Sequence, residues 1–184
     1  MLAGELTALD LSRFDWLENI TFTEIAVDGD GRVSIIYGEG NDILLDTGND
    51  TLIGDGGSDN LHGGFGDDHL EGHGGRDTLH GGPGNDTLIG GGGKFLRDIL
   101  IGGEGADIFV LSRTDWSTIQ DFEDGTDKIK LPEGLTFEDI AITGNINTGL
   151  QPAIFVKNEW PRPLLVRLGN VHFSSLDEDD FIVS

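Results

Sequence analysis

The chain has 184 residues, a formal net charge of −23 and no cysteine. Its length suits one domain or a small composite, and the lack of cysteine excludes disulfide bonds and thiolate metal sites. Because 34 acidic residues stand against 11 basic ones, we expect neither nucleic acid nor an anionic membrane as a partner. No apolar run approaches the roughly 18 residues that span a bilayer, so we expect no membrane insertion either.

Residues 1–36 precede the repeats and are predicted to form an N-terminal flanking or capping segment. The beginning of the chain lacks the basic region and the continuous apolar stretch of a Sec-type signal peptide. ITFTEIAVDGD (20–30) echoes LTFEDIAITGN (135–145), and each copy leads to a short apolar stretch. We expect the early copy to be a strand pair that caps or feeds the repeats, or the tail of a preceding module. DGDGR (28–32) is interpreted as a hairpin turn, since Val33 stands where an EF-hand loop requires glycine.

Residues 37–111 repeat a short unit in which an aspartate is followed two places later by an apolar residue. Successive aspartates are 8, 9, 9, 9, 9, 12 and 9 residues apart, and glycines fill most of the space before each one. The candidate site residues are the eight repeat aspartates Asp42, Asp50, Asp59, Asp68, Asp77, Asp86, Asp98 and Asp107. Their apolar partners are Leu44, Leu52, Leu61, Leu70, Leu79, Leu88, Leu100 and Phe109. Self-similarity at a fixed period indicates a solenoid whose units pack on their neighbours.

The unit D-x-L-x is too short for a helix and fits a strand of about three residues, in which the leucine faces inward. The glycine-rich remainder fits a tight turn, because glycine tolerates positive φ and the close approach of neighbouring turns. Two units then complete one coil, and aspartates two units apart stack about 4.8 Å from each other. Two carboxylates at that spacing repel each other by about 3.5 kcal/mol at an effective dielectric of about 20, and a cation between them reverses the sign. An all-oxygen site that includes backbone carbonyls favours calcium over magnesium or zinc.

The units GGFGDDHLE (63–71) and GGPGNDTLI (81–89) resemble the G-G-x-G-x-D-x-U-x nonapeptide of RTX (repeats-in-toxin) calcium-binding proteins, found in serralysin- and haemolysin-type C-terminal domains. The resemblance implies an all-β fold: a right-handed parallel β-roll with two repeats per coil, flanked by antiparallel capping strands. It also implies about four to six Ca²⁺ ions between successive turns, with the eight repeat aspartates as metal ligands.

Carried onto this chain, the resemblance implies that aspartates two units apart act in pairs on each ion. These pairs are Asp59 with Asp77, Asp68 with Asp86, Asp42 with Asp59, and Asp50 with Asp68. The longer turn GGGGKFLRD (90–98) is expected to disturb the step from Asp77 to Asp98 and to weaken the step from Asp86 to Asp107.

Residues 112–184 are predicted to form a C-terminal capping β-region. GADIFVLSRTDWSTIQDFEDGTDKIKL (105–131) resembles the segment that closes RTX rolls, except that Ser117 stands at the usual first aspartate of D-x-I-x-D-F. AIFVKNEWPRPLLVRLGNVHF (153–173) alternates apolar and polar residues, which predicts antiparallel strands over the open end of the roll. LDEDDFIVS (176–184) resembles the uncleaved signals of type I exporters, and fits equally well an acidic loop before one last strand.

The histidines raise the question of a zinc site. His69 and His73 bracket Glu71, but H-x-E-x-H is not the helical H-E-x-x-H of metalloproteases. His62 and His80 fall on the outer face of the predicted strands and are expected to stack there as surface residues. The sequence also shows no phosphate loop and no nucleophile elbow, so we expect a chain that is not itself an enzyme.

These observations together predict a secreted, extracellular calcium-binding module that folds on binding Ca²⁺ outside the cell and serves as a structural and secretion domain. The type I secretion apparatus would be its transient partner, and a polysaccharide or a cell surface is a further partner to consider. Two alternatives stay open. In the first, the chain is the C-terminal, non-catalytic part of a secreted enzyme, such as a serralysin-like protease, a lipase or an alginate epimerase. In the second, it is part of an adhesin.

Overall fold

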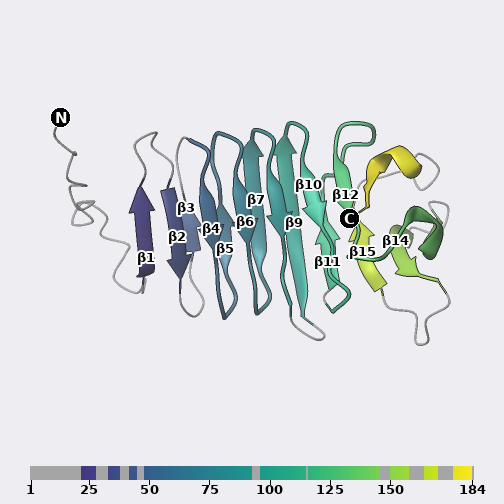
Figure 1. Cartoon of the computed structure of the whole chain (residues 1–184), viewed down its shortest axis with the longest axis horizontal. Helices are drawn as coiled ribbons and strands as arrows, with labels where there is room; N and C mark the ends of the chain where they lie inside the picture. The colour runs from purple at the N-terminus through teal and green to yellow at the C-terminus, as the bar shows by residue number, and fades with distance from the viewer. Residues whose placement is uncertain are drawn as a thin grey trace.

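The strands form two eight-stranded sheets that run along the length of the molecule (Figure 1). The computed structural model describes residues 22–27, 33–37, 42–44, 48–92, 96–114, 116–145, 150–157, 164–169 and 176–183, and for the first three stretches the backbone alone. The first sheet contains, in spatial order, β1 (Phe22–Val27), β2 (Val33–Tyr37), β4 (Thr51–Ile53), β6 (His69–Glu71), β8 (Thr87–Ile89), β10 (Ile108–Val110), β12 (Lys128–Lys130) and β16 (Phe181–Ile182). The second contains β13 (Ile140–Asn145), β14 (Leu150–Val156), β15 (Leu164–Leu168), β11 (Trp116–Ile119), β9 (Arg97–Glu104), β7 (Thr78–Pro83), β5 (Asn60–His62) and β3 (Asp42–Leu44).

Helical structure is confined to two short 3₁₀ helices in the described residues, η2 (Phe137–Asp139) and η4 (Glu178–Asp180). In that same part of the chain, no helix has the length and apolar character needed to cross a membrane.

Successive strands of the repeats alternate between the two sheets, so that two units complete one coil. β5 pairs in parallel with β7, with Leu61 opposite Leu79, and β6 pairs in the same way with β8, with Leu70 opposite Leu88. This arrangement has the two units per coil that the nine-residue period predicts and is the parallel β-roll that the resemblance implies, so the all-β fold class is confirmed.

The interior of the roll is filled by one apolar residue from each strand. In β4, β5, β6 and β8 the middle residue is buried and its neighbours are half-buried, because successive side chains of a strand point to opposite faces. The apolar partners that are 0 % exposed are Leu52, Leu61, Leu70, Leu79, Leu88, Leu100 and Phe109. Outside, His62 and His80 stack with their ring centroids 4.3 Å apart, as expected.

The longer turn before Asp98 leaves the register of the coils unchanged. β9 pairs in parallel with β7, with Leu100 opposite Leu79, and β10 pairs with β8, with Phe109 opposite Leu88. The strand register at these two steps is therefore undisturbed, while the expected weakening of ion binding there stays a prediction. Pairing depends on the D-x-L strands, and a surface turn accepts added residues at little energetic cost.

The first predicted unit is displaced by one residue. β3 pairs in parallel with β5, but Asp42 lies opposite Asn60. The predicted alignment of Asp42 with Asp59 is therefore wrong. A nine-residue step counted back from Asp50 falls on Asn41, whereas the prediction keeps an aspartate at the expense of the constant period.

The N-terminal strand pair feeds the roll, as expected. β1 and β2 form an antiparallel hairpin, with Val27 opposite Val33. β2 then pairs in parallel with β4, with Ile35 opposite Leu52, so that it takes the place of a repeat strand in the first sheet.

Parallel stacking continues one coil beyond residue 111. β11 pairs in parallel with β9, with Ser117 opposite Asp98, and β12 pairs with β10, with Ile129 opposite Phe109. The parallel stacking therefore continues into the segment predicted to be the cap. The division of the chain into separate folding domains stays a prediction.

The far end of the roll carries the antiparallel strands that the alternating pattern predicts. β13 pairs with β14, and β14 with β15, both antiparallel, while β15 lies in parallel on β11. Phe181 and Ile182 pair in parallel with β12, so the acidic segment before them leads into one last strand.

Candidate metal centre

The repeat aspartates form two columns, one along each row of turns. Asp50, Asp68, Asp86 and Asp107 each stand directly before a strand of the first sheet, and Asp59, Asp77 and Asp98 hold the same place in the second sheet. All seven are between 0 and 3 % exposed. The structure therefore brings these seven predicted site residues together as predicted, while Asp42 is out of register.

One carboxylate oxygen of each aspartate holds consecutive coils together. The backbone N–H of one aspartate donates to Oδ1 of the aspartate one coil further along the column. The distances are 2.7 Å from Asp50 to Asp68, 2.8 Å from Asp68 to Asp86, 2.8 Å from Asp86 to Asp107, 2.9 Å from Asp59 to Asp77 and 2.8 Å from Asp77 to Asp98. Sequence reasoning treated each carboxylate as a single ligand and missed this division of labour between its two oxygens.

The second carboxylate oxygen is buried without a protein partner. Oδ2 of Asp68, Asp77, Asp86 and Asp107 is inaccessible to solvent and has no hydrogen bond. A buried carboxylate oxygen without a partner is costly, so its recurrence at the same place of successive units points to a ligand that is positively charged.

The first glycine of each unit leaves a small space beside that oxygen. A Cβ built on Gly72 would lie 2.5 Å from Asp77 Oδ2 and 2.5 Å from the carbonyl oxygen of Gly90 in the next coil. The same arrangement recurs one coil earlier, where a Cβ on Gly54 would lie 2.6 Å from Asp59 Oδ2 and 2.9 Å from the carbonyl oxygen of Gly72. Because any side chain would fill this space, only glycine leaves a cradle that a carboxylate and a carbonyl oxygen border together.

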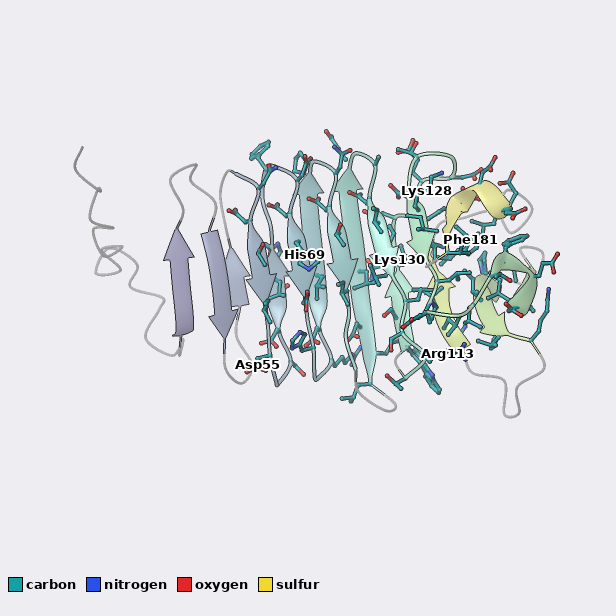
Figure 2. The ribbon with its side chains drawn as sticks, viewed as in Figure 1. Asp55, His69, Arg113, Lys128, Lys130 and Phe181 are labelled. Carbon is teal, nitrogen blue, oxygen red and sulfur yellow. The ribbon has the colours of Figure 1, made fainter. Side chains whose placement is uncertain are left out.

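At the second place of the unit, two units carry a residue other than glycine and still form the same turn. Gly64 and Gly82 have φ of 101° and 120° there, and Asp55 and His73 have φ of 68° and 66°. Aspartate and histidine are among the residues that adopt the left-handed region most readily. Figure 2 shows Asp55 at the turn edge of the roll.

Burial is the main influence on the pKa of four aspartates of the columns. It raises the pKa of Asp77 and of Asp86 to about 7, and that of Asp68 and of Asp107 to about 6. For each of the four, the backbone N–H that binds Oδ1 opposes the rise in pKa, and the neighbouring carboxylates add to it. The repulsion between stacked carboxylates that the sequence predicts is thus present, but the loss of water is the larger effect.

The donor set fits calcium. Each cradle offers hard oxygen atoms, from one carboxylate and from glycine carbonyls, on turns that can adapt to a large cation. Within the residues that the structure describes, no three histidine, cysteine, aspartate or glutamate side chains converge on one point. Carbonyl oxygens must therefore supply most of the remaining ligands, which disfavours zinc and its nitrogen and sulfur donors.

The first column ends at Asp127, which was not among the predicted site residues. The N–H of Asp107 donates to Asp127 Oδ1 at 2.9 Å, but Asp127 Oδ2 accepts the N–H of Glu123 at 2.8 Å. Both oxygens are therefore used, and the column closes here. The D-x-apolar order of Asp127 and Ile129 was the available signal, although 20 residues separate Asp127 from Asp107.

Asp121 has a structural role beside the columns. Its Oδ1 accepts the N–H of Gly102 at 3.0 Å, and its Oδ2 accepts the N–H of Gly103 at 2.9 Å. Because both oxygens bind backbone donors, Asp121 holds the C-terminal part of β9 and is not placed as a ligand.

A second ladder lies on the exposed side of the first column, at the residue before each aspartate. The N–H of Asp67 donates to Asn49 Oδ1 at 2.9 Å, that of Asn85 to Asp67 Oδ1 at 2.8 Å, and that of Ala106 to Asn85 Oδ1 at 3.0 Å. Sequence reasoning missed this ladder, because its only signal was the recurrence of asparagine or aspartate at the fifth place of alternate units.

The histidine cluster does not form a metal centre in this arrangement. Nε2 of His69 and Nε2 of His73 lie 2.7 Å and 2.8 Å from the two carboxylate oxygens of Glu71. Both rings therefore contact the Glu71 carboxylate. Burial raises the pKa of Glu71, but the two histidines lower it by more, so the net shift is downward. Figure 2 shows His69 on the body of the roll, between its two rows of turns.

Glycine turns, an interior of stacked leucines and two columns of buried aspartates together define a parallel β-roll whose oxygen-lined cradles fit calcium. The family model described as "RTX calcium-binding nonapeptide repeat (4 copies)" matches residues 46–79, 62–94 and 97–113. The chain therefore contains an RTX calcium-binding repeat module, as the resemblance implies.

Two solved structures are similar to this chain. The solution structure of the AlgE6R3 subunit of the Azotobacter vinelandii mannuronan C5-epimerase is 28 % identical, with a TM-score of 0.53, over 70 % of this chain and 79 % of that one. The AlgE6R2 subunit of the same enzyme is 26 % identical, with a TM-score of 0.48, over 70 % of this chain and 91 % of that one. No curated protein matches the chain.

Proposed function

We propose that the chain is a secreted module that folds when Ca²⁺ binds between its coils outside the cell, and that it serves as a structural and secretion domain. The observation that carries this proposal is the recurrent buried Oδ2 without a hydrogen-bond partner at Asp68, Asp77, Asp86 and Asp107. When bound, calcium supplies the positive charge that these oxygens lack. We expect about four to six ions along the two columns, the number that the resemblance to RTX proteins implies, at the all-oxygen sites that calcium prefers.

The protein's own groups divide the work of such a site. Oδ1 of each aspartate accepts the N–H one coil away and sets the register, as Asp77 does for Asp59. Oδ2 and the carbonyl oxygen of the first glycine in the next coil, as at Gly72 and Gly90, border the cradle. The leucine that follows each aspartate excludes water from its inner side.

The interior of the roll is too small to hold the coils together alone. One coil spans 18 residues, the separation of Asp59 and Asp77, and buries two leucine-type side chains. Against this small apolar interior, each coil also buries two carboxylates, and their loss of water and mutual repulsion oppose folding. The roll should therefore need cations to form.

The acidic composition supports folding after export. Extracellular calcium modules work at about 10⁻⁴–10⁻³ M calcium, far above the level inside a cell. Before export, the net charge of −23 should keep the chain open through self-repulsion. The C-terminal segment that resembles a type I signal supports the same route.

The test is a calcium titration of the whole chain followed by far-ultraviolet circular dichroism. At neutral pH in chelator the spectrum should be that of a largely unfolded chain, and millimolar calcium should restore the β signal cooperatively, whereas magnesium at the same concentration should not. A β spectrum that is the same in chelator and in calcium would contradict the proposal.

A second candidate is that the module belongs to a larger secreted enzyme as a non-catalytic part. The similarity to AlgE6R3, a subunit of a mannuronan C5-epimerase, favours this candidate. Sequencing the complete reading frame decides between the two, since a catalytic domain in the same chain would support the second. An adhesin would instead have to show binding to a glycan or a cell surface.

A further inference from the structure

Ser117 occupies the place in the second column where the next aspartate would stand. β11 pairs in parallel with β9, with Ser117 directly opposite Asp98. Ser117 is 6 % exposed, whereas Trp116 and Thr118 on either side of it are half-buried. Its hydroxyl therefore lies on the inner side of the strand, where the aspartates lie.

The space beside Gly90 shows what this hydroxyl faces. A Cβ on Gly90 would lie 2.5 Å from Asp98 Oδ2 and 2.9 Å from Ser117 Oγ. One coil earlier, a Cβ on Gly72 would lie 2.5 Å from Asp77 Oδ2 and 2.5 Å from the carbonyl oxygen of Gly90. The two cradles share the aspartate oxygen on one side, and Ser117 Oγ takes the part that a glycine carbonyl plays in the other.

The two columns thus end differently at the C-terminal end of the roll. In the first column, the last aspartate is Asp127, and the N–H of Glu123 already occupies its Oδ2. In the second column, the space beside Gly90 is bordered by Asp98 Oδ2 and by a serine hydroxyl. The hydroxyl oxygen is a neutral and hard donor, which a cation can use as a ligand.

We propose that Ser117 Oγ is a ligand of a further cation site, which it shares with Asp98 at the C-terminal end of the second column. The inference rests on the proposed function, because it assigns one more site to the same roll. The hydroxyl brings no charge where a repeat unit would bring a carboxylate, and the affinity of oxygen sites for calcium rises with the number of charged ligands. This site is therefore the weakest of its column and fills last.

The neighbouring tryptophan provides a readout that reports on this end of the roll. Trp116 is adjacent to Ser117 in β11, so its indole lies within about 10 Å of the site, since consecutive Cα atoms are about 3.8 Å apart. Terbium, an oxygen-seeking cation of a size similar to that of calcium, emits when a nearby tryptophan is excited. The Trp116→Phe variant identifies the part of the emission that comes from this residue.

The experiment compares the whole chain with Ser117→Ala, Ser117→Asp and, as a matched control on the outer face of the same strand, Thr118→Ala. Terbium titrations and calcium stoichiometry by equilibrium dialysis are measured for each. Ser117→Ala should bind one ion fewer and lose the last phase of Trp116-sensitised emission, and Thr118→Ala should match the unmodified chain. Ser117→Asp should keep the stoichiometry and bind the last ion at least about tenfold more tightly, because it adds a charged ligand.

The outcomes separate this inference from the proposed function. If Ser117→Ala keeps the stoichiometry and the emission of the unmodified chain, Ser117 is not a ligand, although the module still binds calcium. If Ser117→Ala fails to fold, Ser117→Asp decides alone, and an unchanged affinity for its last ion overturns the inference. If the unmodified chain binds neither calcium nor terbium, the proposed function itself is wrong.

Discussion

Replacing Gly72 by alanine should remove one cation site from the middle of the roll. The added Cβ would lie 2.5 Å from Asp77 Oδ2 and 2.5 Å from the carbonyl oxygen of Gly90. Both oxygens border the cradle, and one of them is part of the backbone, so neither can move aside easily. The methyl group would therefore occupy the space that a cation needs.

Two contributions set the size of the effect. Forcing an extra methyl group into a packed site costs about 1–3 kcal/mol. Losing one ion that is present at about 100 times its dissociation constant removes about 2.7 kcal/mol more from the free energy of unfolding. The sum, about 4–6 kcal/mol, lowers the melting temperature of a chain of this length by roughly 10–20 °C.

Gly74→Ala is the matched control in the same turn. Its Cβ would meet only Asp55 O at 3.6 Å and Gly92 O at 4.0 Å, which are ordinary contacts. This variant should be unchanged or more stable by about 0.4–1 kcal/mol, because alanine restricts the unfolded chain.

The assay is thermal unfolding, followed by circular dichroism, over a series of calcium concentrations. The slope of unfolding free energy against the logarithm of calcium concentration counts the ions that folding takes up. Gly72→Ala should reduce that slope by one ion, whereas a purely steric defect would lower stability equally at every concentration. An unchanged slope for Gly72→Ala would refute the assignment of the cradle to a cation.

Two further predictions follow from the carboxylates. Asp68→Ala removes both the acceptor that holds Asp50 and a buried Oδ2, so it should reduce the calcium slope. Asp121→Ala removes the acceptor of two glycine N–H groups, so it should lower the free energy of unfolding by about 1–3 kcal/mol and leave the dependence on calcium concentration unchanged. The same calcium dependence for Asp68→Ala and Asp121→Ala would contradict these two roles. The second prediction concerns the pH dependence of stability. Burial raises the pKa of Asp77 and Asp86 from 3.8 to about 7, so in chelator the folded chain holds more protons than the unfolded chain. Stability without calcium should then be greatest below about pH 4 and be lost as the pH rises to about 7. Circular dichroism in chelator at about pH 5 and about pH 7.5 checks this, and an equal β signal at both would contradict the link between these raised pKa values and stability.

Much of the architecture follows from the order of residues along a single unit. An aspartate, a spacer and a leucine make a strand whose alternation sends Leu70 or Leu79 inward, and a turn rich in glycine can return the chain in six residues. These constraints act within nine residues, which is why the two-unit coil, the inner leucines and the stacked histidines His62 and His80 are predictable from the amino-acid sequence alone.

The tertiary structure decided whatever depends on contacts between coils. The N–H of Asp77 binds Asp98 across 21 residues as it would across 18, because the pairing of β7 with β9 fixes the register and the inserted residues stay in the turn. Strand pairing also sets Asp42 one residue out of register, although its residue type fits the repeat. It places Ser117 opposite Asp98, although the repeat pattern would require an aspartate there.

The different roles of the two carboxylate oxygens also lie beyond the sequence. The sequence of a single unit shows that residue 86 is an aspartate. It does not show that Oδ1 of Asp86 accepts the N–H of Asp68 while Oδ2 is buried without a partner. The backbone donor for Oδ1 and the glycine carbonyl beside Oδ2 come from the coils before and after. The period of the sequence therefore determined where the aspartates stack, and only the packing of one coil on the next determined which oxygen is left for a cation.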